Sequence, residues 1–263
     1  MKKTAAYLPF INIIAFAAVI VVNFLSNSLP LNGRTPEQIS NSLPSAFTPA
    51  PYTFSIWGLI YLALTGFIIY QVLPAQRERP FQQQIGWWFV ASGVANIGWI
   101  FSWHYSFYAL SILFMAAILV SLSVIYTRLQ IGCSGQAANW REWLFVHLPF
   151  SLYLGWITVA TIANVASVAP ALGWDGFGIA PAVWAAMMMG AAVVIAGLLL
   201  WNRRDFAYAG VLVWALFGIR AAQADEPLVA NTAVIAAALI VILAVVGYAR
   251  THRQNGTVAP KMA

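Results

Sequence analysis

Apolar residues run in long blocks along most of the chain, and short polar stretches separate these blocks. A transmembrane helix needs about 20 mostly apolar residues. On this criterion we predict eight transmembrane helices, approximately at residues 7–27, 53–74, 84–103, 106–127, 144–168, 180–201, 206–222 and 229–249. A very short turn at the sequence WHYS joins the third and fourth helices, which predicts that these two are antiparallel neighbours.

The charged residues in the polar stretches support this count. With the first residue in the cytoplasm, 11 of the 13 Lys and Arg residues fall on the cytoplasmic side, and only Arg34 and Arg220 fall outside. Cytoplasmic loops of membrane proteins carry such an excess of basic residues. We therefore predict a multi-pass protein of a plasma or inner membrane with both termini in the cytoplasm.

The composition strengthens the membrane assignment. Hydrophobic residues make up 62% of the 263 positions and charged residues only 8%, whereas a soluble domain carries about 25% charged residues. The net charge of +6 comes from basic residues at one membrane face, so we expect a lipid bilayer and no nucleic acid as partner. The single cysteine, Cys133, excludes an intrachain disulfide.

One apolar block contains the sequence YLGWITVATIAN, with polar and aromatic side chains at helical spacing. Tyr153, Trp156, Ala160 and Asn164 follow one another at steps of three, four and four, so a helix places them on one face. A carboxamide in hydrocarbon costs free energy unless it is paired. This face is therefore expected to look inward, at other helices or at a ligand.

Two further blocks repeat the pattern. Trp57 and Tyr61 lie four apart in one, and Asn96, Trp99 and Trp103 lie three and four apart in the other. Aromatic rings with a few hydrogen-bonding groups suit a planar, mostly apolar ligand. Aromatic belts at the membrane interfaces and polar contacts between helices are the alternative explanations.

The polar stretch at residues 28–52 is the longest and is rich in Ser, Pro and Asn. Thr35 and Pro36 can start a short helix, as cap and first helical residue. A loop of this length is either a lid over a binding site or an irregular connector.

These motifs resemble the tryptophan-rich sensory protein (TspO) family, also called the translocator protein or peripheral benzodiazepine receptor family. YLGWITVATIAN resembles its fifth helix, ANIGWIF its third helix, and FTPAPYTFSIWGLIY its first loop and second helix. The resemblance covers residues 1–168. It implies a five-helix bundle with a pocket under the first loop, which binds porphyrins or sterol-like and drug-like apolar molecules, and it implies a homodimer.

Trp57, Asn96 and Trp156 match pocket positions of that family, and their neighbours on the same helix faces complete the site. No cofactor is required, and a porphyrin is the ligand that the resemblance suggests. The predicted ligand-binding residues are Trp57, Tyr61, Asn96, Trp99, Tyr153, Trp156, Ala160 and Asn164.

The chain departs from the family pattern in three ways. The spacing before Trp57 is one residue short, and Leu152 stands where the family has proline. The chain also continues past the fifth helix. We predict an all-α membrane protein with a TspO-like bundle at 1–168, three additional transmembrane helices at 169–249 and a cytoplasmic tail at 250–263. Gly190 and Gly197 are expected to allow close packing of the added helices.

The ionisable residues bear on the class of function. All seven carboxylates lie in loops or at helix ends, which disfavours proton-coupled transport. His104, His147 and His252 fall at different depths and cannot share a metal, and no catalytic motif is present. The sequence thus predicts a membrane receptor or sensor for a planar apolar ligand. An uncoupled transporter of small hydrophobic molecules is the first alternative, and an integral membrane enzyme is the second.

Overall fold

The computed structural model describes residues 7–29, 31–43, 45–133, 137 and 139–256, with side chains as far as residue 250. Every regular element in these ranges is a helix. The elements are α1 (Leu8–Ser28), η1 (Leu31–Gly33), α2 (Pro36–Ser42), η2 (Pro51–Ser55), α3 (Ile56–Val72), η3 (Pro74–Gln76), α4 (Pro80–Ile85), α5 (Trp88–His104), α6 (Tyr108–Arg128), α7 (Trp140–Glu142), η4 (Trp143–His147), α8 (Leu148–Ala171), η5 (Gly176–Gly178), α9 (Pro181–Arg203), α10 (Phe206–Ala222) and α11 (Pro227–Gly256).

The long helices coincide with the predicted apolar blocks. Six of the described helical segments are long and apolar enough to cross a membrane, while α5 and α10 have 17 residues each. The predicted all-α membrane fold is therefore confirmed, and the number of eight spans stays a prediction. Residues 250–256 of the predicted tail continue α11, whereas residues 257–263 lie outside the described residues, as do Lys2, Lys3 and Lys261.

The third predicted helix begins later than expected. Residues 80–85 form the separate helix α4, and Gly86 follows with a φ of +52°. Glycine adopts this region of backbone space without the steric cost that a Cβ imposes. The chain can therefore turn at Gly86, and α5 starts only at Trp88.

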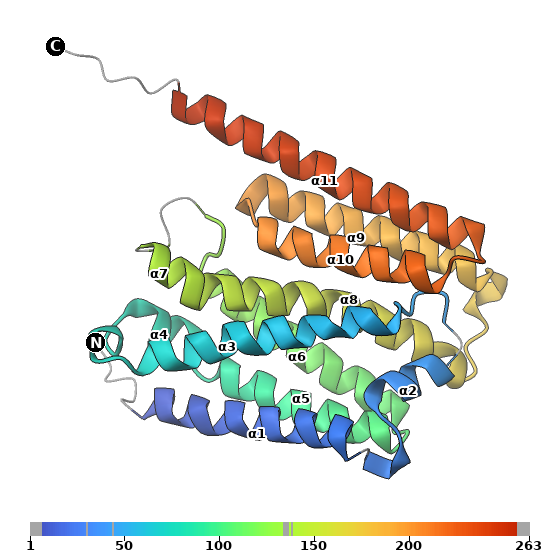
Figure 1. Cartoon of the computed structure of the whole chain (residues 1–263), viewed down its shortest axis with the longest axis horizontal. Helices are drawn as coiled ribbons and strands as arrows, with labels where there is room; N and C mark the ends of the chain where they lie inside the picture. Colours follow the sequence, from blue (N-terminus) through green and yellow to red (C-terminus); the bar gives the residue numbers. More distant parts are fainter. Residues whose placement is uncertain (1–6, 30, 44, 134–136, 138, 257–263) are drawn as a thin grey trace.

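The helices form two groups. One group contains α1, α3, α5, α6 and α8, and the other, which we call the three-helix unit, contains α9, α10 and α11. The two groups meet mainly where α10 packs along α8 (Figure 1). The expected tight turn between α5 and α6 is present, and these helices lie side by side.

The contact between α8 and α10 is close and partly polar. A Cβ at Gly155 of α8 would lie 3.1 Å from Cβ of Val211. The Ser151 hydroxyl donates to the buried Asp205 carboxylate at 2.6 Å, and the Tyr208 hydroxyl donates to Oγ1 of Thr158 at 2.9 Å. Small residues and interhelical hydrogen bonds are the usual means of helix association in membranes.

A small residue also brings α9 and α11 together. Of the two glycines expected to allow close packing, only Gly197 does so. A Cβ at Gly197 would lie 3.3 Å from Cδ1 of Leu243, whereas a Cβ at Gly190 would meet no atom within 4 Å. Gly190 was therefore wrongly expected to mediate close packing, because it is exposed and no neighbouring helix approaches it.

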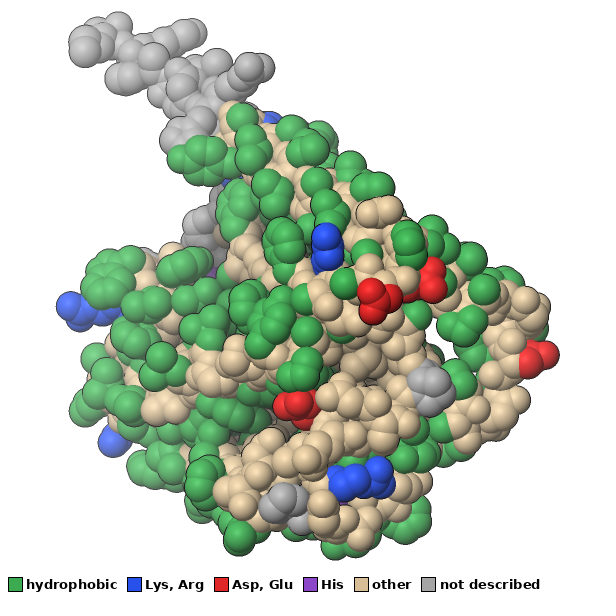
Figure 2. All heavy atoms as spheres, turned by 45° about the vertical axis from the view of Figure 1, so that its right-hand side comes forward, with side chains coloured by type: hydrophobic (Ala, Val, Ile, Leu, Met, Phe, Trp, Pro, Cys, Tyr) green, Lys and Arg blue, Asp and Glu red, His purple; other side chains and the backbone are tan. Residues whose placement is uncertain are grey.

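The molecular surface is apolar over the long helices. Figure 2 shows one face, where hydrophobic side chains cover the helices and charged side chains are few. Several tryptophans are exposed, among them Trp87, Trp140, Trp143, Trp174 and Trp201. Such a surface is typical of a multi-pass membrane protein, because lipid replaces water around it.

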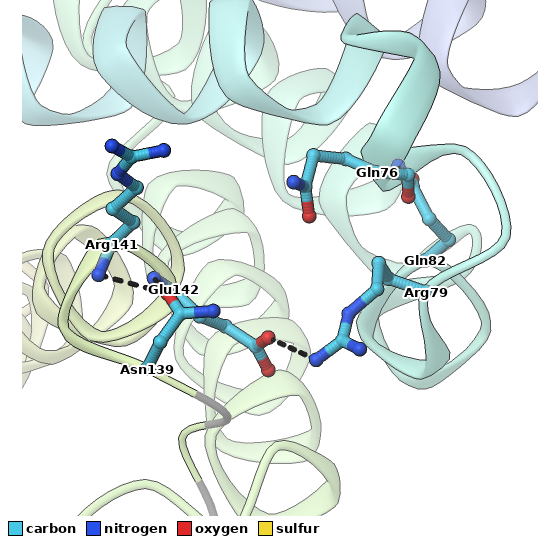
Figure 3. Close-up of polar contacts among 6 residues, drawn as sticks. All are labelled: Gln76, Arg79, Gln82, Asn139, Arg141 and Glu142. Carbon is cyan, nitrogen blue, oxygen red and sulfur yellow. Dashed lines mark hydrogen bonds and ion pairs between the residues drawn. The ribbon is translucent and has the colours of Figure 1, made fainter.

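An ion pair joins the chain before α4 to the last residue of α7 (Figure 3). Nη2 of Arg79 lies 2.8 Å from Oε2 of Glu142, and the Glu142 side chain is only 8% exposed. The hydrogen bond to Glu142 raises the pKa of Arg79. The Asn139 side chain accepts from the backbone N–H groups of Arg141 and Glu142 and so caps the helix.

We expect Arg79→Gln to destabilise the protein, because Glu142 would keep a nearly buried charge without its partner. Arg79 is itself 38% exposed, so solvent reduces the loss to about 1–2 kcal/mol. Thermal unfolding in detergent, followed by circular dichroism, should show a lower midpoint. Arg77→Gln in the same loop is the matched control and should leave the midpoint unchanged.

Candidate ligand cavity

A cavity of about 510 Å³ lies within the first helix group, at the end of the bundle near α2. This volume falls within the usual range for small-molecule sites, about 300–1,000 Å³. Its walls come from α1, α2, α3, α5, α6, α8 and the chain before α3. The lining residues are Ile20, Asn23, Phe24, Asn27, Pro36, Glu37, Ser40, Pro49, Phe54, Trp57, Gly58, Tyr61, Trp99, Ile100, Trp103, Met115, Trp156, Val159, Ala160, Ala163, Asn164 and Ser167.

Three helices bring the aromatic side chains together at this cavity. The rings of Trp57 and Tyr61 are stacked at 5.3 Å, and Trp57 meets Trp156 edge to face at 6.3 Å. On α5, the rings of Trp99 and Trp103 are stacked at 5.7 Å. The wall is therefore a set of rings that fix one another's orientation.

Six of the eight predicted ligand-binding residues line this cavity. They are Trp57, Tyr61, Trp99, Trp156, Ala160 and Asn164. The side-chain period of a helix predicts such faces, and the packing of α3, α5 and α8 turns them toward one another.

Asn96 and Tyr153 lie behind the wall instead. Asn96 is 1% exposed, and its Oδ1 accepts a hydrogen bond from Nδ2 of Asn23 at 2.7 Å. The buried Tyr153 ring contacts the Trp57 ring edge to face at 5.8 Å. Asn96 therefore ties α1 to α5, and Tyr153 supports Trp57.

Four polar atoms on the cavity residues have no hydrogen-bond partner within the described part of the chain. They are the Tyr61 hydroxyl, Nε1 of Trp99, Nε1 of Trp156 and Oδ1 of Asn164. The Asn164 amide is oriented by its Nδ2, which donates to Oγ of Ser111 at 3.2 Å. Buried polar groups without a partner are rare and costly, so these atoms make the cavity a candidate binding site.

The stretch after α1 forms an ordered cover over the cavity. Thr35 caps α2 in a capping box with Gln38, as the sequence predicted for Thr35. Nε1 of Trp103 donates to the Pro36 carbonyl at 3.1 Å, and Ile39 is fully buried between Trp103 and Val168. Helix α2 is therefore fixed to α5 and α8 by specific contacts, and a role of this stretch as a lid stays a prediction.

Sequence reasoning missed the contribution of α1 and of the chain before α3. Asn23 and Asn27 lie four apart in the first apolar block, which is the spacing that identified the other faces. The same criterion applied to that block would have found them. Phe54 and Met115 gave no such signal, because single apolar residues in apolar segments look alike.

Comparison with known proteins identifies the family to which the chain belongs. The family model of TSPO-like proteins matches residues 9–246. The chain belongs to the TSPO-like protein family. The suspected resemblance to TspO proteins is thus confirmed, and the match extends over the three-helix unit as well. The division of the chain at residue 168 stays a prediction.

Comparisons with curated proteins and with solved structures gave no match. Family membership therefore supports a membrane protein of the TspO type. The ligand has to be inferred from the cavity itself.

Proposed function

We propose that this TSPO-like protein is a membrane receptor or sensor that binds a planar, mostly apolar, porphyrin- or sterol-like ligand. The observation that carries the proposal is the pair of buried, unpartnered indole N–H groups of Trp99 and Trp156, two residues that line the aromatic cavity. In a low-dielectric site, each such donor gains free energy from an acceptor that a ligand supplies.

The chemistry of the wall limits the ligand class. The stacked rings of Trp57 and Tyr61 favour contact with a flat apolar surface. The N–H groups require acceptor atoms on the ligand, and Oδ1 of Asn164 requires a donor. A porphyrin combines a flat ring with carboxylate acceptors and pyrrole N–H donors, and a sterol hydroxyl can both donate and accept.

Titration of the purified protein with protoporphyrin tests this proposal. We expect saturable binding with quenching of tryptophan fluorescence and a shift of the porphyrin absorbance. Trp99→Phe keeps a ring but removes the N–H, so the affinity should fall about fivefold.

Trp201→Phe is the matched control, because Trp201 is 58% exposed and lies on α9 outside the cavity. Its affinity should equal that of the unaltered protein. If the unaltered protein, Trp99→Phe and Trp201→Phe all bind protoporphyrin with equal affinity, the Trp99 N–H group has no role in binding.

Receptor and transporter differ in what happens after binding. Proteoliposomes loaded with protoporphyrin should retain it to the same extent with and without the protein, if the protein is a receptor. Time-dependent release that requires the protein would favour the uncoupled transporter instead. Conversion of the porphyrin to a product of altered absorbance would favour an enzyme.

A further inference from the structure

The three-helix unit touches the cavity wall through α10. The backbone N–H of Ala50 donates to the Gly218 carbonyl at 2.9 Å, and Nε1 of Trp214 donates to the Thr53 carbonyl at 3.0 Å. The rings of Tyr52 and Trp214 also meet edge to face at 5.5 Å. One end of α10 thus binds residues 50–53, which lie more than 160 positions earlier in the chain.

The close approach depends on glycine at position 218. A Cβ at Gly218 would collide with Oγ1 of Thr53 and would stand 2.8 Å from Cγ2 and 2.9 Å from Cβ of the same residue. Thr53 is fully buried. Any side chain at position 218 would therefore push residues 50–53 away from α10.

Residues 50–53 lie within one wall of the ligand cavity. Pro49 and Phe54, on either side of them, line the cavity, and Trp57 follows one turn later. The Phe54 ring contacts the Trp156 ring edge to face at 5.9 Å. A displacement of residues 50–53 would consequently separate Phe54 and Trp57 from the opposite wall on α8.

The same helix is also fixed to that opposite wall. Ser151 and Thr158 of α8 are hydrogen-bonded to Asp205 and Tyr208 at the other end of α10. Because α10 holds α8 with one end and residues 50–53 with the other, it sets the distance between the two walls.

We propose that α10 is a clamp on the ligand cavity and that Gly218 and Trp214 are its positioning residues. The identity of the ligand rests on the proposed function, whereas the clamp rests on the contacts of α10 alone. Coupling between two sites is reciprocal. A ligand in the cavity that contacts Trp57 and Trp156 therefore stabilises the contact of α10 with residues 50–53, and the three-helix unit registers whether the cavity is occupied.

A thiol in the cavity wall reports on the clamp without any ligand. In a Cys133→Ser background, Ala160→Cys supplies the only thiol, and its rate of alkylation by N-ethylmaleimide measures access to the cavity. We expect Gly218→Ala to raise this rate about fivefold, because the displaced wall opens the cavity more often. Trp214→Phe, which loses one hydrogen bond but keeps the ring, should raise the rate by a smaller factor.

Gly210→Ala is the matched control on the same helix, because a Cβ there meets no atom within 4 Å. Its rate should equal that of the background protein. Thr53→Ala combined with Gly218→Ala should return the rate part of the way, because Thr53→Ala removes the Oγ1 and Cγ2 atoms that collide and leaves only the Thr53 Cβ, at 2.9 Å. This rescue separates the clamp from general destabilisation.

The proposal is overturned if the introduced thiol reacts at the same rate in the Gly218→Ala, Trp214→Phe and Gly210→Ala proteins. It is also overturned if adding Thr53→Ala to Gly218→Ala does not lower the rate. If the Gly218→Ala protein does not fold, the comparison of Trp214→Phe with Gly210→Ala decides: a faster alkylation in Trp214→Phe supports the clamp, and an equal rate contradicts it. Protoporphyrin binding is measured on the same proteins with Ala160 restored. An unaltered protein that binds no porphyrin contradicts the proposed function, while the alkylation rates still decide the clamp.

Discussion

Ala160→Trp is expected to lower the affinity for protoporphyrin at least about 100-fold, a loss of about 2.7 kcal/mol of binding free energy. Ala160 lines the cavity on α8, one turn from Trp156. An indole at this position would occupy the space that the ligand needs. The cavity of about 510 Å³ can accept this ring, so the protein should still fold. Absorbance titration with protoporphyrin measures the affinity.

Val165→Trp is the control for this substitution. Val165 lies on the same helix, is 41% exposed and does not line the cavity. The added ring would face outward from the bundle, and the affinity should remain that of the unaltered protein. An Ala160→Trp protein that binds as tightly as the Val165→Trp protein would show that the ligand binds elsewhere.

Asn96→Leu is expected to have the largest effect on stability. It removes the acceptor of the buried Asn23 amide, whose hydrogen bond to Asn96 spans 2.7 Å. A buried donor left without its partner costs about 1–3 kcal/mol. The thermal midpoint in detergent should fall by several degrees. Porphyrin affinity should fall as well, because α1 contributes Asn23, Phe24 and Asn27 to the cavity wall.

The double variant Asn23→Leu and Asn96→Leu separates the lost hydrogen bond from other effects. With both carboxamides replaced by apolar side chains, no Asn23–Asn96 pairing is left unmade, and most of the stability should return. A double variant less stable than Asn96→Leu alone would contradict the assignment of Asn96 as a link between α1 and α5. The comparison needs only the two thermal midpoints.

The helices themselves could be predicted from the sequence, because each apolar block is long enough to need internal backbone hydrogen bonding in a membrane. The faces of α3, α5 and α8 could be predicted for a similar reason. Side chains three and four positions apart share one side of a helix, so Trp57 with Tyr61, and Trp156 with Ala160, had to face the same way.

The partners of these faces could not be predicted. Whether Asn96 looks into the cavity or toward α1 depends on the rotation of α5, which many weak contacts determine together. The contact of Gly218 with Thr53 joins parts of the chain far apart in sequence. No local pattern signals which of the glycines in α9 and α10 is the one that another segment approaches.

The proposed clamp gives the additional helices of this family member a role. The five helices around the cavity supply the rings and the unpaired polar atoms, and α10 of the three-helix unit contacts both residues 50–53 and α8. Ligand binding and the arrangement of the three-helix unit should therefore change together, as expected for a sensor.

The central claim is that a ligand pairs with the indole N–H groups of Trp99 and Trp156. The most direct test is a ¹⁵N–¹H spectrum of the 12 tryptophan side chains, assigned by Trp→Phe variants and recorded with and without protoporphyrin. We predict that the Trp99 and Trp156 signals move downfield on saturation, as N–H groups do when they gain an acceptor, while the exposed Trp201 signal stays. Bound porphyrin with both cavity signals unmoved would contradict the account.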